Sequence, residues 1–470
     1  MSSVPLVYAH FRHGPNSEVF PNIGLGHVAG AAASAGHEVL CLDPIVDGSS
    51  CHSLAQKVRQ YNPDLVGFSC YTQDIDNASV AAETIKRELP ETFIVVGGYH
   101  PSAVPVQTIE QYPCFDGVVY GEGELTIVEL LRVLEHGGDL TSVKGLCFRK
   151  GGAVVANPPR PQIPDLDTLP FPLFDGLPLS AYNRFYSWVK GISIPICTAR
   201  GCPYSCNFCY RLHGSTVRAR SAENVLDEME HDIARYGAKN IFFVDETFTL
   251  NKDRTARLCE AILERGLQRK VRWLCCSRVD AVTYELLKLM KKAGCALISF
   301  GIESGNQDIL ERCKKKILLG QVRSTLEWCR KCGIATATAF IIGHPGETED
   351  KINQTIDFAV KVRPTYCNFC IMTPFPGTEI AAMAERGEGG LVLLSRDWRT
   401  YGKSLGGALE LKSVNRRRLE SLQRKAYAKF YLRPSRFRRL FEMASPAVYV
   451  RYAWHTLKEN AHRKMGMRHR

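Results

Sequence analysis

Three cysteines in one short segment are the residues best suited to chemistry. Cys202, Cys206 and Cys209 are separated by three and two residues, directly after the predicted strand Ile192–Ala199. Iron–sulfur clusters prefer thiolate ligands and normally take four. Three ligands leave one iron open for a substrate, as in a catalytic zinc site. The spacing therefore predicts a 4Fe-4S cluster with a free coordination position.

Two other interpretations of these cysteines remain open. A zinc site would need a fourth ligand, and His213 lies four residues after Cys209. The cysteines could also be purely structural. Their position after the first strand of a repeating strand–helix pattern favours the cluster.

That pattern covers the middle of the chain. Six strand–helix units in about 180 residues fit a complete or partial barrel, in which the carboxyl ends of the strands carry the chemistry. The strands are predicted at Ile192–Ala199, Asn240–Val244, Val271–Ser277, Ala296–Gly301, Ala335–Ile342 and Tyr366–Met372, with helices at Ala222–Tyr236, Arg254–Arg265, Val282–Ala293, Gly320–Lys331 and Glu349–Val362.

Polar residues and glycines follow these strands in turn. Acidic side chains suit ammonium and hydroxyl groups, and glycine lets the backbone approach a ligand closely. Each acid alone could be an ordinary strand-end charge, and Arg278 could form a surface salt bridge as readily as bind a carboxylate. The candidates are Asp245, Glu246, Arg278, Glu303, Ser304, Ile342 and Gly343.

The cysteine spacing, with Tyr210 directly after Cys209, resembles that of the radical S-adenosylmethionine (radical SAM) superfamily. The resemblance extends over the whole barrel. It implies that S-adenosyl-L-methionine binds the open iron and is cleaved reductively to a 5′-deoxyadenosyl radical. It also implies that Asp245 and Glu246 hold the methionine amine, that Glu303 and Ser304 hold the ribose and carboxylate, and that Ile342 and Gly343 lie near the adenine.

The first 140 residues predict a doubly wound parallel sheet. Short apolar strands alternate with helices, so both faces of the sheet are covered, and ligands are expected at the carboxyl ends of the strands. The strands are predicted at Pro5–Ala9, Glu38–Leu42, Leu65–Ser69, Phe93–Val96 and Gly117–Tyr120, with helices at Gly24–Ala35, Ser53–Tyr61, Ala78–Leu89 and Leu125–Glu135.

The ends of these strands resemble a cobalamin-binding domain. That domain has a serine after strand three and a glycine pair after strand four, here Ser69 and, 28 residues later, Gly97 with Gly98. Another flavodoxin-like domain is the alternative. The residues that the resemblance assigns to cobalamin are Ser69, Thr72, Gly97, Gly98, His100, Gly121, Glu122 and Gly123.

One motif of cobalamin domains is missing. The Asp-x-His-x-x-Gly sequence, which supplies a histidine ligand to cobalt, does not occur in the loop Ala9–Asn16. We therefore expect cobalt without a protein histidine ligand, with His13 as the alternative. His100 is expected to be structural or near the edge of the corrin ring.

The composition of the chain indicates the cellular compartment in which the protein resides. The 470 residues are 45% apolar and include 18 cysteines, without an apparent export signal or a long apolar run. These features predict a cytoplasmic protein with reduced thiols and no transmembrane segment.

Positive charge is concentrated at the end of the chain. Residues 411–470 hold 17 Lys and Arg against 3 Glu, whereas the whole chain carries +12. Packed helices with a solvated basic face, an acidic or carrier-bound substrate and an anionic membrane surface are all compatible with this charge, and no motif indicates specific nucleic-acid binding. The predicted divisions are a cobalamin-binding domain (1–140), a linker (141–190), a radical SAM barrel (191–400) and a helical segment (401–470).

The two resemblances together imply a cobalamin-dependent radical SAM methyltransferase acting on an unactivated carbon of a small molecule. One S-adenosylmethionine would methylate cobalamin and another would yield the radical, with an electron donor such as flavodoxin or ferredoxin. Two alternatives remain: a cyclisation or rearrangement without methyl transfer, as in tetrapyrrole ring cyclisation, and a non-catalytic cobalamin sensor.

Overall fold

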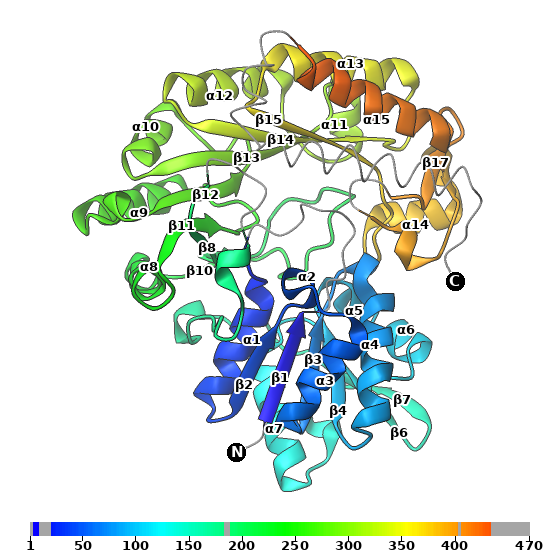
Figure 1. The fold of residues 1–470 in the computed structure, drawn as a ribbon. Helices are drawn as coiled ribbons and strands as arrows, with labels where there is room; N and C mark the ends of the chain where they lie inside the picture. Colours follow the sequence, from blue (N-terminus) through cyan, green and yellow to red (C-terminus); the bar gives the residue numbers. More distant parts are fainter. Residues whose placement is uncertain (1–2, 9–19, 183–188, 403–405, 434–470) are drawn as a thin grey trace.

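The computed structural model describes residues 3–8, 20–182, 189–402 and 406–433 (Figure 1). Two parallel sheets follow one another along the chain, each flanked by helices. The prediction of a doubly wound sheet followed by a partial barrel is thus confirmed. The loop that carries His10 and His13, and residues 434–470, lie outside the described residues, so the expectations for them stay predictions.

The first sheet begins with five parallel strands. In spatial order they are β2 (Glu38–Leu42), β1 (Ser3–Tyr8), β3 (Leu65–Ser69), β4 (Phe93–Gly97) and β5 (Gly117–Val119). Two layers of helices cover its faces, because α1 packs on α7 and α3 packs on α4. These helices are α1 (Ile23–Ser34), α3 (Cys51–Tyr61), α4 (Ile75–Glu88) and α7 (Glu124–His136).

This sheet extends beyond residue 140. The strands β6 (Leu146–Lys150) and β7 (Ala153–Ala156) form a hairpin that pairs antiparallel with β5. Its turn consists of Gly151 and Gly152, both with positive φ, which glycine adopts without steric cost. The beginning of the predicted linker therefore belongs to the first sheet.

The second sheet has six parallel strands. Their spatial order is β8 (Ile192–Ile196), β11 (Ala238–Phe243), β12 (Arg272–Ser277), β13 (Cys295–Glu303), β14 (Ala335–Ile342) and β15 (Tyr366–Ile371). The sheet stays open, because β8 and β15 are its two edges. Its outer helices are α8 (Ala222–Tyr236), α9 (Lys252–Glu264), α10 (Tyr284–Lys292), α12 (Leu319–Lys331) and α13 (Glu349–Val362).

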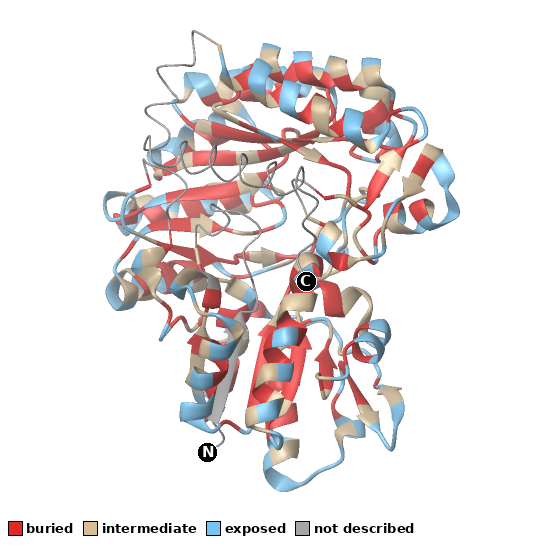
Figure 2. Ribbon diagram, turned by 45° about the vertical axis from the view of Figure 1, so that its right-hand side comes forward, coloured by how far each residue is buried: buried red, intermediate tan, exposed pale blue. Residues whose placement is uncertain are grey.

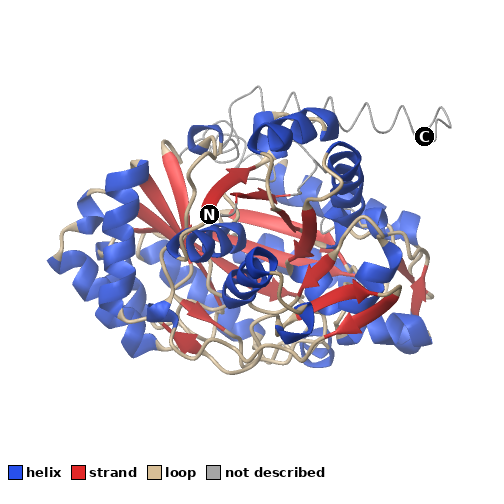
Figure 3. Cartoon of the chain, turned by 90° about the horizontal axis from the view of Figure 1, so that it is seen from below, coloured by secondary structure: helices blue, strands red, loops and turns tan. Residues whose placement is uncertain are grey.

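Burial follows this arrangement. The strands are largely buried, whereas the outer faces of the helices are exposed (Figure 2). Seen from below, helices lie on both sides of the strands and also in front of them (Figure 3). No helix of the described residues is long and apolar enough to span a membrane.

The described part of the basic C-terminal segment is the packed helix α15 (Arg416–Tyr431). Its Gln423 side chain donates a 2.7 Å hydrogen bond to the Phe369 carbonyl of β15. Arg418 and Lys429 form ion pairs with Glu349 and Asp357 of α13. Part of the positive charge therefore pairs within the protein.

Shorter elements complete the fold. They are α2 (Pro44–Asp47), α5 (Tyr99–Ala103), α6 (Pro105–Gln111), β9 (Ala199–Arg200), β10 (Arg218–Ala219), α11 (Gln307–Arg312), α14 (Glu379–Arg386), β16 (Leu391–Leu393) and β17 (Leu409–Leu411).

Candidate functional site

The three predicted cluster ligands lie on one closed loop. We call residues 201–217 the cluster loop; β9 and β10, which pair antiparallel at its base, form the cluster ribbon. The Cys202 N–H donates a 3.1 Å hydrogen bond to the Gly214 carbonyl. Gly201 has φ +99°, and a Cβ there would lie 2.2 Å from the Thr216 carbonyl oxygen. Only glycine lets the loop close in this way.

The thiols on this loop form no disulfide. Cys202 and Cys206 are half-buried, and Cys209 is exposed. Although the Cys209 side chain is exposed at its surface, desolvation by the surrounding protein and the nearby Cys206 raise its pKa to about 12, so iron would have to displace its proton. No three His, Cys, Asp or Glu side chains among the described residues meet closely enough to bind a single metal ion. A cluster instead holds each thiolate on its own iron, and three thiols on one loop fit this donor set.

A buried lysine beside the cluster loop is the main residue that the sequence did not reveal. Lys315 is 7% exposed, and its ammonium lies 3.0 Å from Glu303 Oε1. Burial would lower the pKa of Lys315, but Glu303 and the nearby Cys206 raise it above its ordinary value. Because Lys315 sits in a run of three lysines, its sequence context indicates a solvated surface, and no local signal predicts its burial.

Asp245 follows β11, as predicted, but its carboxylate is turned toward β8. Its two oxygens accept hydrogen bonds from the Thr198 N–H and hydroxyl, both at 2.6 Å. The side chain is buried, and this burial raises its pKa to about 6. The carboxylate therefore fixes the end of the first barrel strand, and its role toward the methionine amine stays a prediction.

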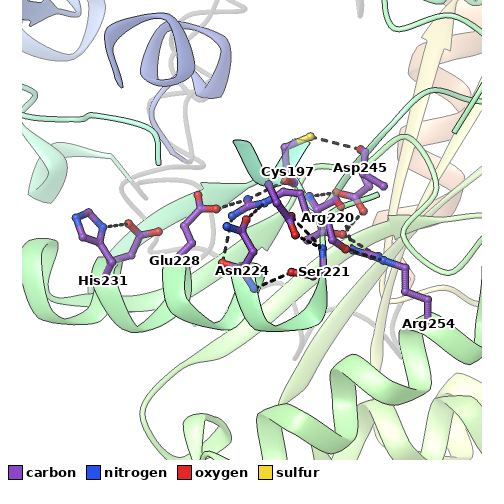
Figure 4. A network of polar contacts seen from close by, with 12 residues as sticks. Cys197, Arg220, Ser221, Asn224, Glu228, His231, Asp245 and Arg254 are labelled. Carbon is purple, nitrogen blue, oxygen red and sulfur yellow. Dashed lines mark hydrogen bonds and ion pairs between the residues drawn. The ribbon is translucent and has the colours of Figure 1, made fainter. Parts of the chain in front are cut away.

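An arginine network holds the base of the cluster ribbon (Figure 4). Arg220 forms an ion pair with Glu228 and donates hydrogen bonds to the Cys197 carbonyl and the Asn224 side chain, at 3.1 and 2.6 Å. Arg254 donates to the carbonyl oxygens of Thr198 and Arg220 at 2.9 and 3.0 Å. These bonds tie the start of the cluster ribbon to α8 and α9.

Glu246, next to Asp245, faces the cluster loop. Its Oε1 lies 2.8 Å from His213 Nδ1. Burial would raise the pKa of Glu246, but the His213 contact lowers it below its ordinary value. The structure thus brings Glu246 to the cluster loop and pairs the candidate zinc ligand His213 with it.

Arg278 forms a buried bridge. It binds Asp280 through two hydrogen bonds of 3.0 and 2.9 Å and donates a third, of 2.8 Å, to the Lys315 carbonyl. Its guanidinium also lies 3.6 Å from the ring centre of Tyr204 on the cluster loop. Of the two alternatives for Arg278, the structure supports the salt bridge, although it is buried rather than on the surface.

The remaining barrel candidates, Glu303, Ser304, Ile342 and Gly343, each have different contacts. Glu303 points toward Lys315 with φ +73°, whereas Ser304 is buried and bonds Thr355 on α13 at 3.1 Å. Ile342 is buried in the core. The Gly343 N–H donates a 2.6 Å hydrogen bond to a buried glutamate, Glu347.

Small residues gather at the carboxyl edge of the first sheet. Ser69 and Gly97 are register partners, and a Cβ on Gly98 would lie 2.7 Å from the Cys70 carbonyl oxygen. Gly121 has φ +80°, and a Cβ there would meet nothing within 4 Å, so this position is open. The edge therefore has small residues and open space, which fits a large flat group such as a corrin. Thr72, in the turn after β3, is buried.

Aromatic residues border the same edge. The rings of Tyr71 and Tyr99 stack with centroids 5.4 Å apart and are 44% and 37% exposed. His100 instead lies in the core, with its ring 4.9 Å from that of Trp398. Burial lowers the pKa of His100 to about 4. Of the two expectations for His100, the structural one agrees with its burial.

Glu122 does not lie on the open edge with Gly121. Its oxygens lie 3.0 Å from Arg200 Nη1 and 2.9 Å from Arg218 Nη2, both on the cluster ribbon. The structure thus places this carboxylate, which the resemblance assigns to cobalamin, at the contact between the two sheets. Its partners are distant in sequence, so no local pattern reveals them. The adjacent Gly123 packs against Val28 of α1.

Tyr210 connects the two parts of the molecule. A Cβ on Gly377, in the loop after β15, would lie 2.6 Å from the Tyr210 ring and 3.2 Å from Ala103 of the first sheet's α5. The residue after the third cysteine therefore lies where the barrel meets the N-terminal domain.

Comparisons with known proteins agree with this organisation. Residues 196–359 match the model of the radical SAM superfamily, and residues 17–131 match the B12 binding domain. The chain is 35% identical to an uncharacterized methyltransferase of Pyrococcus horikoshii, over 88% of each chain. It is 31% identical to the anaerobic magnesium-protoporphyrin IX monomethyl ester cyclase of Cereibacter sphaeroides, over 80% of this chain and 63% of the cyclase.

A solved structure has the same fold. It is the radical S-adenosylmethionine methyltransferase TsrM from Kitasatospora setae, with cobalamin and a [4Fe-4S] cluster bound. The TM-score is 0.73 at 19% identity, over 93% of this chain and 90% of that one. With both domain matches and a relative aligned over nearly its full length, the chain belongs to the cobalamin-binding radical SAM enzymes, whose cofactors are a 4Fe-4S cluster, S-adenosylmethionine and cobalamin.

Proposed function

We propose that the enzyme transfers a methyl group to an unactivated carbon of a small-molecule substrate. When bound, the cluster and S-adenosylmethionine supply a carbon radical, and cobalamin supplies the methyl group. The observation that carries the proposal is that Tyr210, directly after the cluster cysteines, and Ala103 of the N-terminal domain both border Gly377, at 2.6 and 3.2 Å from where its Cβ would lie. It supports a substrate site between the two cofactors.

The chain's own residues would hold these groups and exclude water. We assign Cys202, Cys206 and Cys209 to the cluster, and we assign Glu246 and Glu303 to the polar end of S-adenosylmethionine because both lie beside the cluster loop. The open edge at Ser69, with its exposed tyrosine pair, is the proposed cobalamin surface.

The similarity to the P. horikoshii methyltransferase favours methyl transfer, since it spans 88% of both chains. The chain spans only 63% of the cyclase, so cyclisation is the second candidate. We further propose that the enzyme is cytoplasmic, because its 18 cysteines are all free thiols. Reductive cleavage of S-adenosylmethionine would also need a one-electron donor such as flavodoxin or ferredoxin.

The two candidates differ in their by-products. Methyl transfer consumes one S-adenosylmethionine to S-adenosylhomocysteine and another to 5′-deoxyadenosine. The reconstituted enzyme, incubated anaerobically with reductant and fractions of cell extract, should therefore form both by-products in equal amounts in the fraction that contains the substrate. Formation of 5′-deoxyadenosine alone in that fraction would favour cyclisation or rearrangement.

A further inference from the structure

The two strands at the base of the cluster loop are both held by one carboxylate of the N-terminal domain. Arg200 and Arg218 are register partners in the cluster ribbon, directly before and after the loop. Glu122 Oε1 lies 3.0 Å from Arg200 Nη1 and 2.9 Å from Arg218 Nη2, and Glu122 Oε2 lies 3.0 Å from Arg218 Nη1. A single side chain therefore clamps both ends of the loop that carries the cysteines.

Two further groups complete this clamp. Glu124 Oε1 lies 2.5 Å from Arg200 Nη2. The Ile163 N–H donates to Glu122 Oε2 at 2.7 Å, and the Ile163 carbonyl accepts from Arg218 Nη1 at 2.6 Å. Two guanidinium groups thus meet two carboxylates, and the segment between the domains closes the ring of contacts.

The clamp is shielded from water. The side chains of Glu122, Glu124, Arg200 and Arg218 are 3–8% exposed. Burial alone would raise the pKa of Glu122, but Arg218, the Ile163 N–H and Arg200 together lower it below its ordinary value. Removing the Glu122 charge would leave Arg218 without its carboxylate partner in this buried contact, which is costly.

Glu122 also belongs to the loop that borders the open edge of the first sheet. Its neighbour Gly121 faces open space there. One short loop after β5 therefore lines the proposed cobalamin surface and grips the base of the cluster loop.

We propose that Glu122 is a positioning residue that fixes the cluster loop relative to the cobalamin domain. The role rests on the proposed function, since methyl transfer across the domain contact needs a set separation of the two cofactors. A misplacement of about 1 Å can slow such a reaction about 100-fold.

Hydrogen–deuterium exchange of the full-length chain tests the positioning without any substrate. In Glu122→Gln, peptides from residues 201–217 should exchange about tenfold faster than in the wild type, because the clamp has lost its charge. Peptides from α13, in the distant part of the barrel, should not change. The matched control is Glu129→Gln, which removes a glutamate of the same domain that pairs with Arg160 outside the ribbon.

A second measurement separates positioning from cofactor binding. S-adenosylmethionine-dependent methylation of reduced cobalamin, followed by absorbance in the reconstituted enzyme, needs no carbon substrate. Because the methyl group has no acceptor in this assay, each enzyme molecule reacts once, and Glu122→Gln should lower the single-turnover rate constant about 100-fold with the half-saturating concentration of S-adenosylmethionine and the cofactor content unchanged. Arg218→Lys keeps the positive charge but loses the two-point contact with Glu122. Its rate constant for cobalamin methylation should lie between those of Glu122→Gln and the wild type.

Two results would overturn the proposal. Unchanged exchange in residues 201–217 would show that the clamp does not hold the loop, and faster exchange in both sheets would show that Glu122 only stabilises the fold. If Glu122→Gln cannot be purified folded, Arg218→Lys takes its place in both measurements. Because exchange is measured without substrate, failure of the methyl-transfer proposal would leave this result intact.

Discussion

The ammonium of Lys315 lies 3.0 Å from Glu303 Oε1, with both side chains less than a tenth exposed. The pair sits beside the cluster loop, whose Asn207 N–H donates to the Cys313 carbonyl two residues away from Lys315. A buried ion pair at this place orients the last residue of β13 toward the cysteines.

Replacing Lys315 with Met should destabilise the protein strongly. The variant leaves Glu303 buried without its cation, which costs about 3–5 kcal/mol. Urea unfolding of the cofactor-free chain measures this loss. The control is Lys331→Met, which breaks an exposed ion pair with Glu327 and should change the free energy of unfolding little. Equal stability of the two variants would mean that the Lys315 pair contributes nothing beyond a surface contact.

Gly201→Ala should prevent cluster assembly. The new Cβ would lie 2.2 Å from the Thr216 carbonyl oxygen at φ +99°, so the cluster loop could not keep its present closure. Iron and sulfide analysis after reconstitution should show most of the cluster lost. Gly237→Ala, at φ +67° with open space around it, should cost about 1 kcal/mol and retain the cluster. A full cluster in Gly201→Ala would contradict the described loop.

Glu347 should make stability depend on pH. Burial raises its pKa from 4.5 to about 7, although the N–H groups of His344 and Gly343 lower it in part. The folded state then binds the proton more tightly than the unfolded state, so this group's contribution to stability falls as pH rises from 4.5 to 7. The integrated effect is about 3 kcal/mol.

Glu347→Gln removes this titration. Urea unfolding between pH 5 and 8 should show the stability of the variant increasing relative to the wild type as the pH rises. A constant difference between the two proteins would show that Glu347 keeps an ordinary pKa.

Cys206→Ala should separate the two cofactor sites. The variant should form no 5′-deoxyadenosine, because the cluster loses one of three ligands, but it should still bind cobalamin at the other sheet. Chromatography measures the nucleoside, and absorbance after gel filtration measures cobalamin. The control is Cys332→Ala, at the end of α12, which should still form 5′-deoxyadenosine and bind cobalamin. Loss of cobalamin along with the nucleoside would show that the sites are not independent.

Local sequence patterns predicted most of the fold. The strands Glu38–Leu42, Leu65–Ser69 and Ala335–Ile342 have the predicted bounds, because apolar runs between turn residues are local signals. The hairpin β6–β7 was not predicted, although Gly151-Gly152 between two apolar runs is a hairpin signal.

The site was predicted less completely, because many of its side chains bond residues that are distant in sequence. Motif spacing indicated that Glu246 and the cluster loop lie at the same edge of the barrel, and Glu246 contacts His213 of that loop. The spacing could not show that Arg200 pairs with Glu122, 78 residues away. Nor could it show that Asp245 turns to Thr198 while its neighbour Glu246 turns to His213, since both acids follow the same strand.

The most direct test of methyl transfer follows the methyl group itself. The reconstituted enzyme would be incubated anaerobically with S-adenosylmethionine that carries a trideuterated methyl group, a reductant and the active extract fraction, and the products would be analysed by mass spectrometry. Methyl transfer by this enzyme predicts a product that carries the trideuterated methyl group on a carbon atom. A converted substrate without any added methyl group would contradict methyl transfer.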